Sequence, residues 1–158
     1  MKNISRTRKA FIIWIIAALM TTVSAQSEKN ILKTPDQLEW IQMPTLREGT
    51  KAAIIEGDLH KPGPFTFHLK LPAGFVIPPH HHPWTEHSTV ISGTLNMGFG
   101  EKVDRSNTKP LPAGSVIIIQ PDVNHYSWAS EETVVQVHGI GPLIIEFVNP
   151  DDDPRITK

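Results

Sequence analysis

The sequence has 158 residues, 15 of them Lys or Arg and 16 Asp or Glu, and it contains no cysteine. A chain of this length has room for one domain of ordinary size. Because there is no thiol, the chain can form neither a disulfide framework nor a thiolate metal site. Any metal ion would therefore need histidine and carboxylate ligands.

The first 25 residues have the pattern of a secretory signal peptide. Four basic residues between positions 2 and 9 precede the apolar run 11–20, and small or polar residues follow as far as Ala25. An uncleaved membrane anchor is the alternative, but a spanning helix needs about 20 apolar residues, roughly twice this run. We expect cleavage after Ala25 and a secreted or periplasmic protein that is not attached to the membrane.

Cleavage would leave a mature chain of 133 residues (158 minus 25) that begins at Gln26. The four basic residues leave with the signal peptide, so 11 basic residues remain against 16 acidic ones, a net charge of −5. A domain with this charge is not expected to bind nucleic acid. It is also long enough to bury a core without disulfides.

The leader 26–49 is expected to hold one short helical turn. Thr34 can cap it, Pro35 can occupy the first helical position, and Asp36 places an acid in the first turn.

Beyond the leader the sequence predicts short β-strands. Residues 65–71 alternate apolar and polar side chains, which is the period of a strand with one buried face. Further strands are expected at 52–57, 75–77, 87–92, 94–99, 115–119, 126–128, 133–138 and 143–148. Gly93 is interpreted as the turn of a hairpin, 104–112 as an exposed loop, and 149–158 as a solvated acidic tail. Strands this short favour an all-β sandwich or barrel in one domain.

Five of the eight histidines lie at positions 80, 81, 82, 87 and 125. Residues two apart in a strand share a face, so His80 and His82 can bind one ion while His81 points away. Glu86 can add a carboxylate after a short turn, and His125 must come from elsewhere in the fold. Three imidazoles and one carboxylate leave two positions of an octahedral ion free, a set that suits Fe, Mn, Ni, Co or Zn.

In these residues the sequence resembles the cupin superfamily. Gly74, His80, His82, Glu86 and Gly93 have the spacing of its first motif. The resemblance covers residues 50–148.

The second motif of that superfamily is matched less completely. Gly114 and His125 fit, but Gln120-Pro121-Asp122 stands where Pro-x-Gly is usual, and Ala129 where Asn is usual. The resemblance implies a single double-stranded β-helix, or jelly-roll, barrel. It also implies one divalent metal in the barrel mouth, and often a homodimer.

Two positions leave alternatives open. The motif allows three or four residues after the second histidine, so His87 could replace Glu86 as ligand; Glu86 is favoured because it keeps the interval to Gly93. His138 shares a strand face with Gln136, a pattern that fits a polar barrel interior in which His138 acts as proton donor or acceptor. It fits equally a histidine bonded to backbone at the barrel rim.

The remaining histidines and aromatic residues have plainer interpretations. His60 and His68 have no partners in sequence and are expected at the surface. Trp84, Tyr126 and Trp128 flank the ligands, where they can line a substrate pocket or belong to the core.

Two functions remain open from the sequence. The first is a metalloenzyme of the oxygenase, isomerase or lyase type, whose ion binds a small-molecule substrate at its free positions. The second is a module that binds a small ligand or metal without turnover, because this fold serves both roles. The enzyme is favoured, since open metal positions beside acid-base groups are more useful to catalysis than to storage.

Overall fold

The computed structural model describes residues 30–156, so the signal-peptide prediction for residues 1–25 lies outside the described part. The strands are β1 (Ile41–Gln42), β2 (Lys51–Glu56), β3 (Gly63–Leu71), β4 (Val76–His81), β5 (Glu86–Ser92), β6 (Thr94–Phe99), β7 (Lys109–Pro112), β8 (Val116–Ile119), β9 (His125–Ala129), β10 (Thr133–Gly141) and β11 (Glu146–Phe147). Short 3-10 turns lie at η1 (Pro35–Gln37), η2 (Arg105–Asn107) and η3 (Pro150–Asp152). No helix within residues 30–156 has the length and apolar character needed to cross a membrane.

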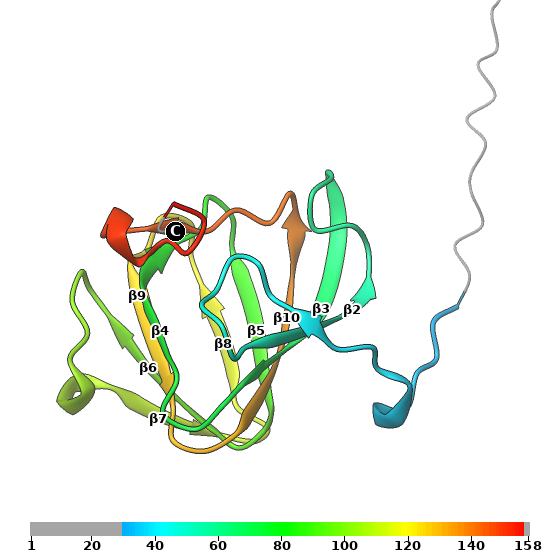
Figure 1. The fold of residues 1–158 in the computed structure, drawn as a ribbon, viewed down its shortest axis with the longest axis horizontal. Coiled ribbons are helices and arrows are strands. Elements are labelled where there is room, and N and C mark those ends of the chain that lie inside the picture. The colour runs from blue at the N-terminus through cyan, green and yellow to red at the C-terminus, as the bar shows by residue number, and fades with distance from the viewer. Residues whose placement is uncertain (1–29, 157–158) are drawn as a thin grey trace, which may run out of the picture. The chain divides into compact units, whose positions relative to one another are not determined.

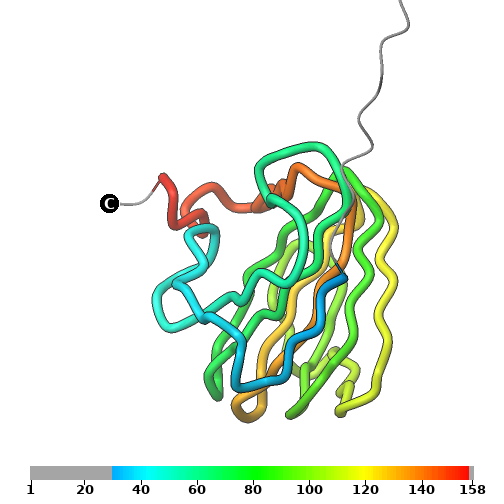
Figure 2. Tube along the Cα trace, turned by 90° about the vertical axis from the view of Figure 1, so that its right-hand side faces the viewer, coloured from blue at the N-terminus to red at the C-terminus, as the bar shows by residue number. Residues whose placement is uncertain are grey.

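The strands form two antiparallel sheets that face each other (Figures 1 and 2). One sheet has the order β1-β2-β3-β10-β5-β8 and the other the order β11-β4-β9-β6-β7. Neighbours in each sheet are often distant in sequence, as expected for a jelly roll. The prediction of an all-β fold is confirmed.

The core lies between the sheets, and β3 shows why. Phe65, Phe67, Leu69 and Leu71 are all buried, and the residues between them face outward. Burying each such side chain contributes roughly 1.5–3 kcal/mol, so the free energy of folding strongly favours burial of this face of β3. The strict alternation in the sequence therefore predicted the inner face of β3 correctly.

Gly93 does not turn a hairpin, so that interpretation was wrong. β5 and β6, which flank it, belong to different sheets and do not pair. Gly93 has φ of 75°, and a Cβ there would lie 2.5 Å from the carbonyl oxygen of Glu132. The glycine is required because the chain changes sheets at a left-handed residue pressed against a neighbouring backbone.

Two segments expected to be irregular or solvated are more ordered than predicted. The expected loop 104–112 contains β7, which pairs with β6. In the acidic tail, Asp153 is 8% exposed and its carboxylate accepts a 2.7 Å hydrogen bond from Arg155. Arg155 also donates to the carbonyl oxygen of Ile145 at 2.8 Å. The tail is therefore fixed to the sheet region by an arginine that composition alone did not single out.

Candidate metal centre

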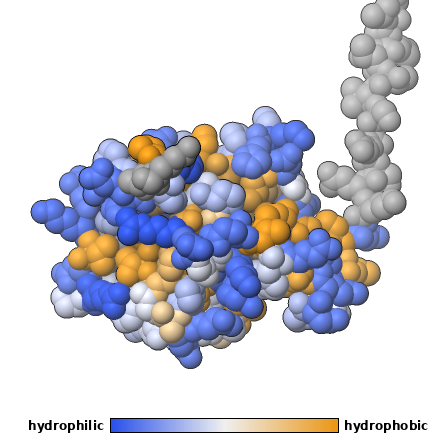
Figure 3. Space-filling model, viewed as in Figure 1, coloured by the Kyte–Doolittle hydropathy of each residue, from blue (hydrophilic) through white to orange (hydrophobic). Residues whose placement is uncertain are grey.

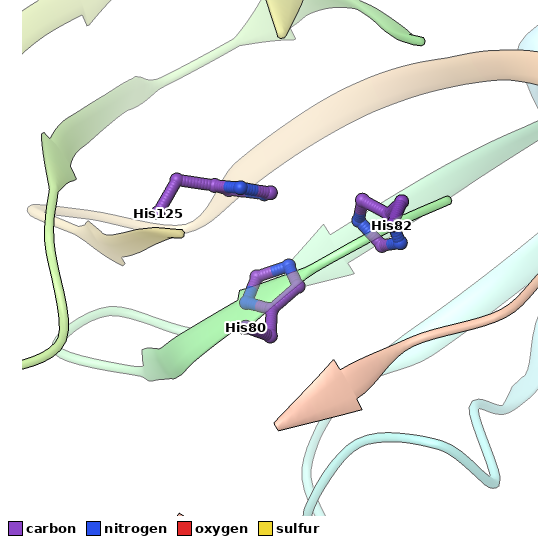
Figure 4. Close-up of side chains that lie close together, drawn as sticks. All are labelled: His80, His82 and His125. Atoms are coloured by element: carbon purple, nitrogen blue, oxygen red, sulfur yellow. The ribbon is translucent and has the colours of Figure 1, made fainter. Parts of the chain in front are cut away.

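Four polar side chains meet in the interior, and they come from both sheets. His80 of β4 lies directly opposite His125 of β9 in the register of those strands. His82 directly follows the last residue of β4, and Glu86 is the first residue of β5 in the other sheet. Figure 4 shows the three imidazole rings gathered in one space.

The distances fit a single ion. His80, His82 and His125 are 5%, 6% and 2% exposed, and one nitrogen of each lies within 4.8 Å of the others. The Nε2 atoms of His82 and His125 are each 3.3 Å from Glu86 Oε2. Ligand atoms about 2.1 Å from a metal are about 3.0–3.4 Å apart in octahedral or tetrahedral geometry. The carboxylate therefore already stands at ligand spacing from two imidazoles.

Backbone carbonyls fix the orientation of all three rings. The Nδ1 atoms of His80, His82 and His125 donate to the carbonyl oxygens of Pro78, Ile144 and Val123 at 2.7, 2.6 and 2.8 Å. A carbonyl oxygen only accepts hydrogen bonds, so each Nδ1 must carry the hydrogen. Each Nε2 is then left as a lone-pair donor, which is the arrangement typical of metal-binding histidines.

The electrostatics of the cluster favour a neutral His80 imidazole and an ionised Glu86 carboxylate. Burial, and then the neighbouring His125 and His82, lower the pKa of His80 to about 3. Burial by itself would raise the pKa of Glu86, but the neighbouring His125 and His82 outweigh burial and hold that pKa well below 4.5. Both protonation states are those that bind a divalent cation.

His81 and His87, the neighbours of the cluster residues, point away from it. His81 lies 3.7 Å from Asp122 and 3.6 Å from Glu146, on the opposite side of β4. His87 is exposed and lies opposite Ile118 of β8 and His138 of β10. Strand alternation turns Glu86 toward the interior and His87 outward, because only one of two consecutive residues can face the interior.

His138 does not lie in the interior, so the proposed position for a catalytic acid or base was wrong. Its side chain is exposed, and its Nδ1 is 3.0 Å from Thr66 Oγ1. Val135 and Val137 of the same strand face inward and are 4% and 7% exposed. The interior is apolar at this level, so the alternating polar positions of β10 face outward.

The three aromatic residues near the ligands divide between the interior and the outside. Trp84 stacks on His82 with ring centroids 4.7 Å apart, and it lines the cavity of the cluster. Tyr126 is buried and donates to the carbonyl oxygen of Asp104 at 3.0 Å. Trp128 packs under Arg105 at 4.7 Å. Only Trp84 of the three borders the candidate metal centre.

Sequence reasoning missed two serines that belong to the site. Ser88 donates a 2.5 Å hydrogen bond to Glu86 Oε1, and Ser127 lines the cavity. Each lies two residues beyond a ligand, Glu86 or His125, so the strand period was the signal that could have found them.

The motif departure at Asp122 has a local backbone explanation. Asp122 stands where the family has glycine, and its φ is 61°. Its amide donates to the carbonyl oxygen of His82 at 2.8 Å. The left-handed turn before His125 is thus retained with an aspartate, one of the residues that tolerate it best.

Solved structures with the same fold include enzymes. The polyketide cyclase RemF from Streptomyces resistomycificus gives a TM-score of 0.63 at 15% identity, over 80% of this chain and 90% of that one. A putative acetylacetone dioxygenase from Methylibium petroleiphilum gives 0.61 at 16% identity, over 80% and 86%. The acetylacetone dioxygenase from Acinetobacter johnsonii gives 0.60 at 11% identity, over 97% and 88%. At such identities the likeness shows the fold alone.

A comparison by sequence identifies the family. No curated protein matches the chain. The family described as the ChrR cupin-like domain matches residues 28–144, which is most of the sequence and includes all four residues of the cluster. The chain therefore belongs to the ChrR cupin-like family of the cupin superfamily.

Proposed function

We propose that this protein is an exported metalloenzyme that holds one divalent ion through His80, His82, Glu86 and His125 and transforms a small molecule in its barrel. The observation that carries the proposal is the convergence of three buried imidazoles and one carboxylate from two sheets, with three Nε2 atoms freed by backbone carbonyls. Four protein ligands leave two positions of an octahedral ion for substrate and water or dioxygen.

The kind of chemistry follows from which groups surround the cluster. Among the described residues that line its cavity, the titratable side chains are the four proposed ligands themselves. With His138 outside, no further side chain within residues 30–156 lines the cavity where it could move a proton between carbon atoms. A bound ion would supply Lewis-acid or redox chemistry at that place. We therefore favour an oxygenase over an isomerase or lyase, and the dioxygenases among the structural neighbours support this choice.

The same observation supports a second candidate, a module that binds a small ligand or metal without turnover. A site without a free acid or base suits binding as well as metal-centred reaction. The two candidates differ in turnover, and only the metalloenzyme requires the metal ion.

Export is part of the proposal and rests on the residues of the N-terminus. A basic head, the apolar run 11–20 and small residues up to Ala25 support it. Mass spectrometry of the protein isolated from its native cells tests it. A mature chain that begins at Gln26 is expected, and an intact Met1 would contradict export by cleavage.

Metal analysis of the protein from its native compartment tests the centre. Close to one ion per chain is expected, and His82→Ala should remove it. Oxygen uptake by the metal-loaded protein in the presence of candidate substrates then separates the two candidates. Metal-free protein that binds a small ligand with full affinity would favour the binding module and contradict the metalloenzyme.

A further inference from the structure

The cavity around the cluster is small and mostly apolar. Its volume is about 60 Å³, room for roughly four water molecules. Apart from the four proposed ligands, its polar lining consists of Ser88, Ser127 and Trp84, and no lysine or arginine of the described chain borders it. It has room for a metal ion and a few ligand atoms, and it offers no cation to pair with a phosphate or a second carboxylate.

A larger apolar hollow lies beside this cavity. It has a volume of about 360 Å³ and is bordered by residues of β1, β2 and the segment 57–60. Ile41 and Ile54 contribute apolar surface there, and Figure 3 shows hydrophobic surface over β2 and β3. Thr45 Oγ1 lies in its wall, buried and without a hydrogen-bond partner in residues 30–156.

Met43 and Leu143 border both spaces. Met43 is 3% exposed and comes from the leader after β1, whereas Leu143 comes from the segment between β10 and β11. The amide of Leu143 donates to the carbonyl oxygen of Leu59 at 2.7 Å, so its backbone is fixed independently of its side chain. Met43 and Leu143 therefore form a wall that the inner cavity and the outer hollow share.

We infer that the natural ligand is amphipathic, with a metal-chelating oxygen head in the inner cavity and an apolar chain or ring that passes between Met43 and Leu143 into the outer hollow. The inference rests on the proposed metal centre. The inner cavity is too small for more than the head, and the adjoining hollow offers apolar walls to the remainder. A methionine is suited to such a gate, because its unbranched side chain adapts to what it contacts.

Alkyl hydroxamates of increasing length test this inference, because they keep the same two chelating oxygens while the chain grows. Calorimetric titration of the zinc-loaded mature protein with acetohydroxamate, hexanohydroxamate and octanohydroxamate gives the affinities. We expect the dissociation constant to fall about fourfold for each methylene that enters the hollow. Ile54→Trp, which fills the hollow from β2 and does not border the inner cavity, should bind acetohydroxamate normally and abolish the gain with length.

Ile140→Trp is the matched control, because Ile140 is 60% exposed and borders neither space. It should keep the full gain. If Ile54→Trp fails to fold, Ile41→Trp blocks the hollow from β1 instead. Acetohydroxamate binding without any gain with length would overturn the inference and leave the metal centre standing. If the protein binds neither zinc nor acetohydroxamate, the proposed function fails, and the inference fails with it.

Discussion

His82 Nδ1 donates a 2.6 Å hydrogen bond to the carbonyl oxygen of Ile144, a residue 62 positions further along the chain. This bond ties a proposed metal ligand to the segment that carries Leu143 and Ile145 into the cavity wall. Groups that orient a ligand in this way typically contribute 10–100-fold to metal affinity. The carbonyl belongs to the backbone, so the segment between β10 and β11 can serve the site without any polar side chain.

His125→Ala should remove most of the metal affinity. It deletes one of three buried imidazoles, and no other described side chain stands where it could replace the Nε2 donor. We expect at least a 100-fold weaker dissociation constant for zinc, measured by competition with a chromophoric chelator. His138→Ala is the control, because its ring lies on the outer face beside Thr66. Equal losses in both variants would contradict the assigned centre.

Glu86→Gln and His87→Gln decide between two consecutive candidates. Glu86 Oε2 lies 3.3 Å from two imidazole nitrogens, whereas His87 is exposed on the outer face of β5. An amide is a weaker, uncharged ligand, so Glu86→Gln should lower the metal content of the purified protein roughly tenfold or more. His87→Gln should retain one ion per chain. The reverse result would place the ligand at position 87.

Much of this site could be predicted from local sequence because β-structure has a period of two. The spacing His80-x-His82 places two rings on one face, and the strict alternation of residues 65–71 identified the core face of β3. The spacing of the motif, rather than any single residue, linked His125 to the other three.

The parts that sequence did not predict depend on partners distant along the chain. The sequence of residues 87–99 predicted a hairpin. Instead, β5 pairs with β8 and β10 in one sheet, whereas β6 pairs with β7 and β9 in the other. His138 and Val137 alternate as a strand should, but only the packing of Phe67 opposite Val137 shows which of them faces inward. A period of two defines two faces without saying which is buried.

The metal-free protein should lose stability as the pH falls from about 6.5 toward 3. The folded-state pKa of His80 is lowered to about 3, whereas an unfolded histidine has about 6.5. Between these values the unfolded chain binds a proton that the folded chain does not, so acid favours unfolding by up to about 1.4 kcal/mol per pH unit. Above about 6.5 this residue contributes no slope. Glu86, with its lowered pKa, adds a further loss only below 4.5.

Urea unfolding of the metal-free protein at pH 5, 6 and 7 measures this dependence. His80→Asn removes the titrating ring, so the variant should show a smaller fall in the free energy of unfolding between pH 7 and pH 5. The window lies above the range of Glu86, which separates the two groups. An unchanged slope in the variant would show that His80 is protonated in the folded state as readily as in the unfolded one.

Asp122→Gly should stabilise the protein while leaving the metal centre intact. A left-handed backbone costs an ordinary residue about 1–2 kcal/mol. Glycine avoids this cost, but its greater conformational entropy in the unfolded chain cancels part of the gain. The Asp122 side chain is 74% exposed and stands 3.7 Å from His81, a contact worth little. Its amide bond to the carbonyl oxygen of His82 survives the change. We expect the free energy of unfolding in urea to rise by about 0.5–1 kcal/mol, with zinc affinity within twofold of the parent.

Asp122→Ala removes the same carboxylate but keeps a Cβ at φ of 61°, so it should be no more stable than the parent. Equal gains from glycine and alanine would trace the effect to the carboxylate instead of the backbone.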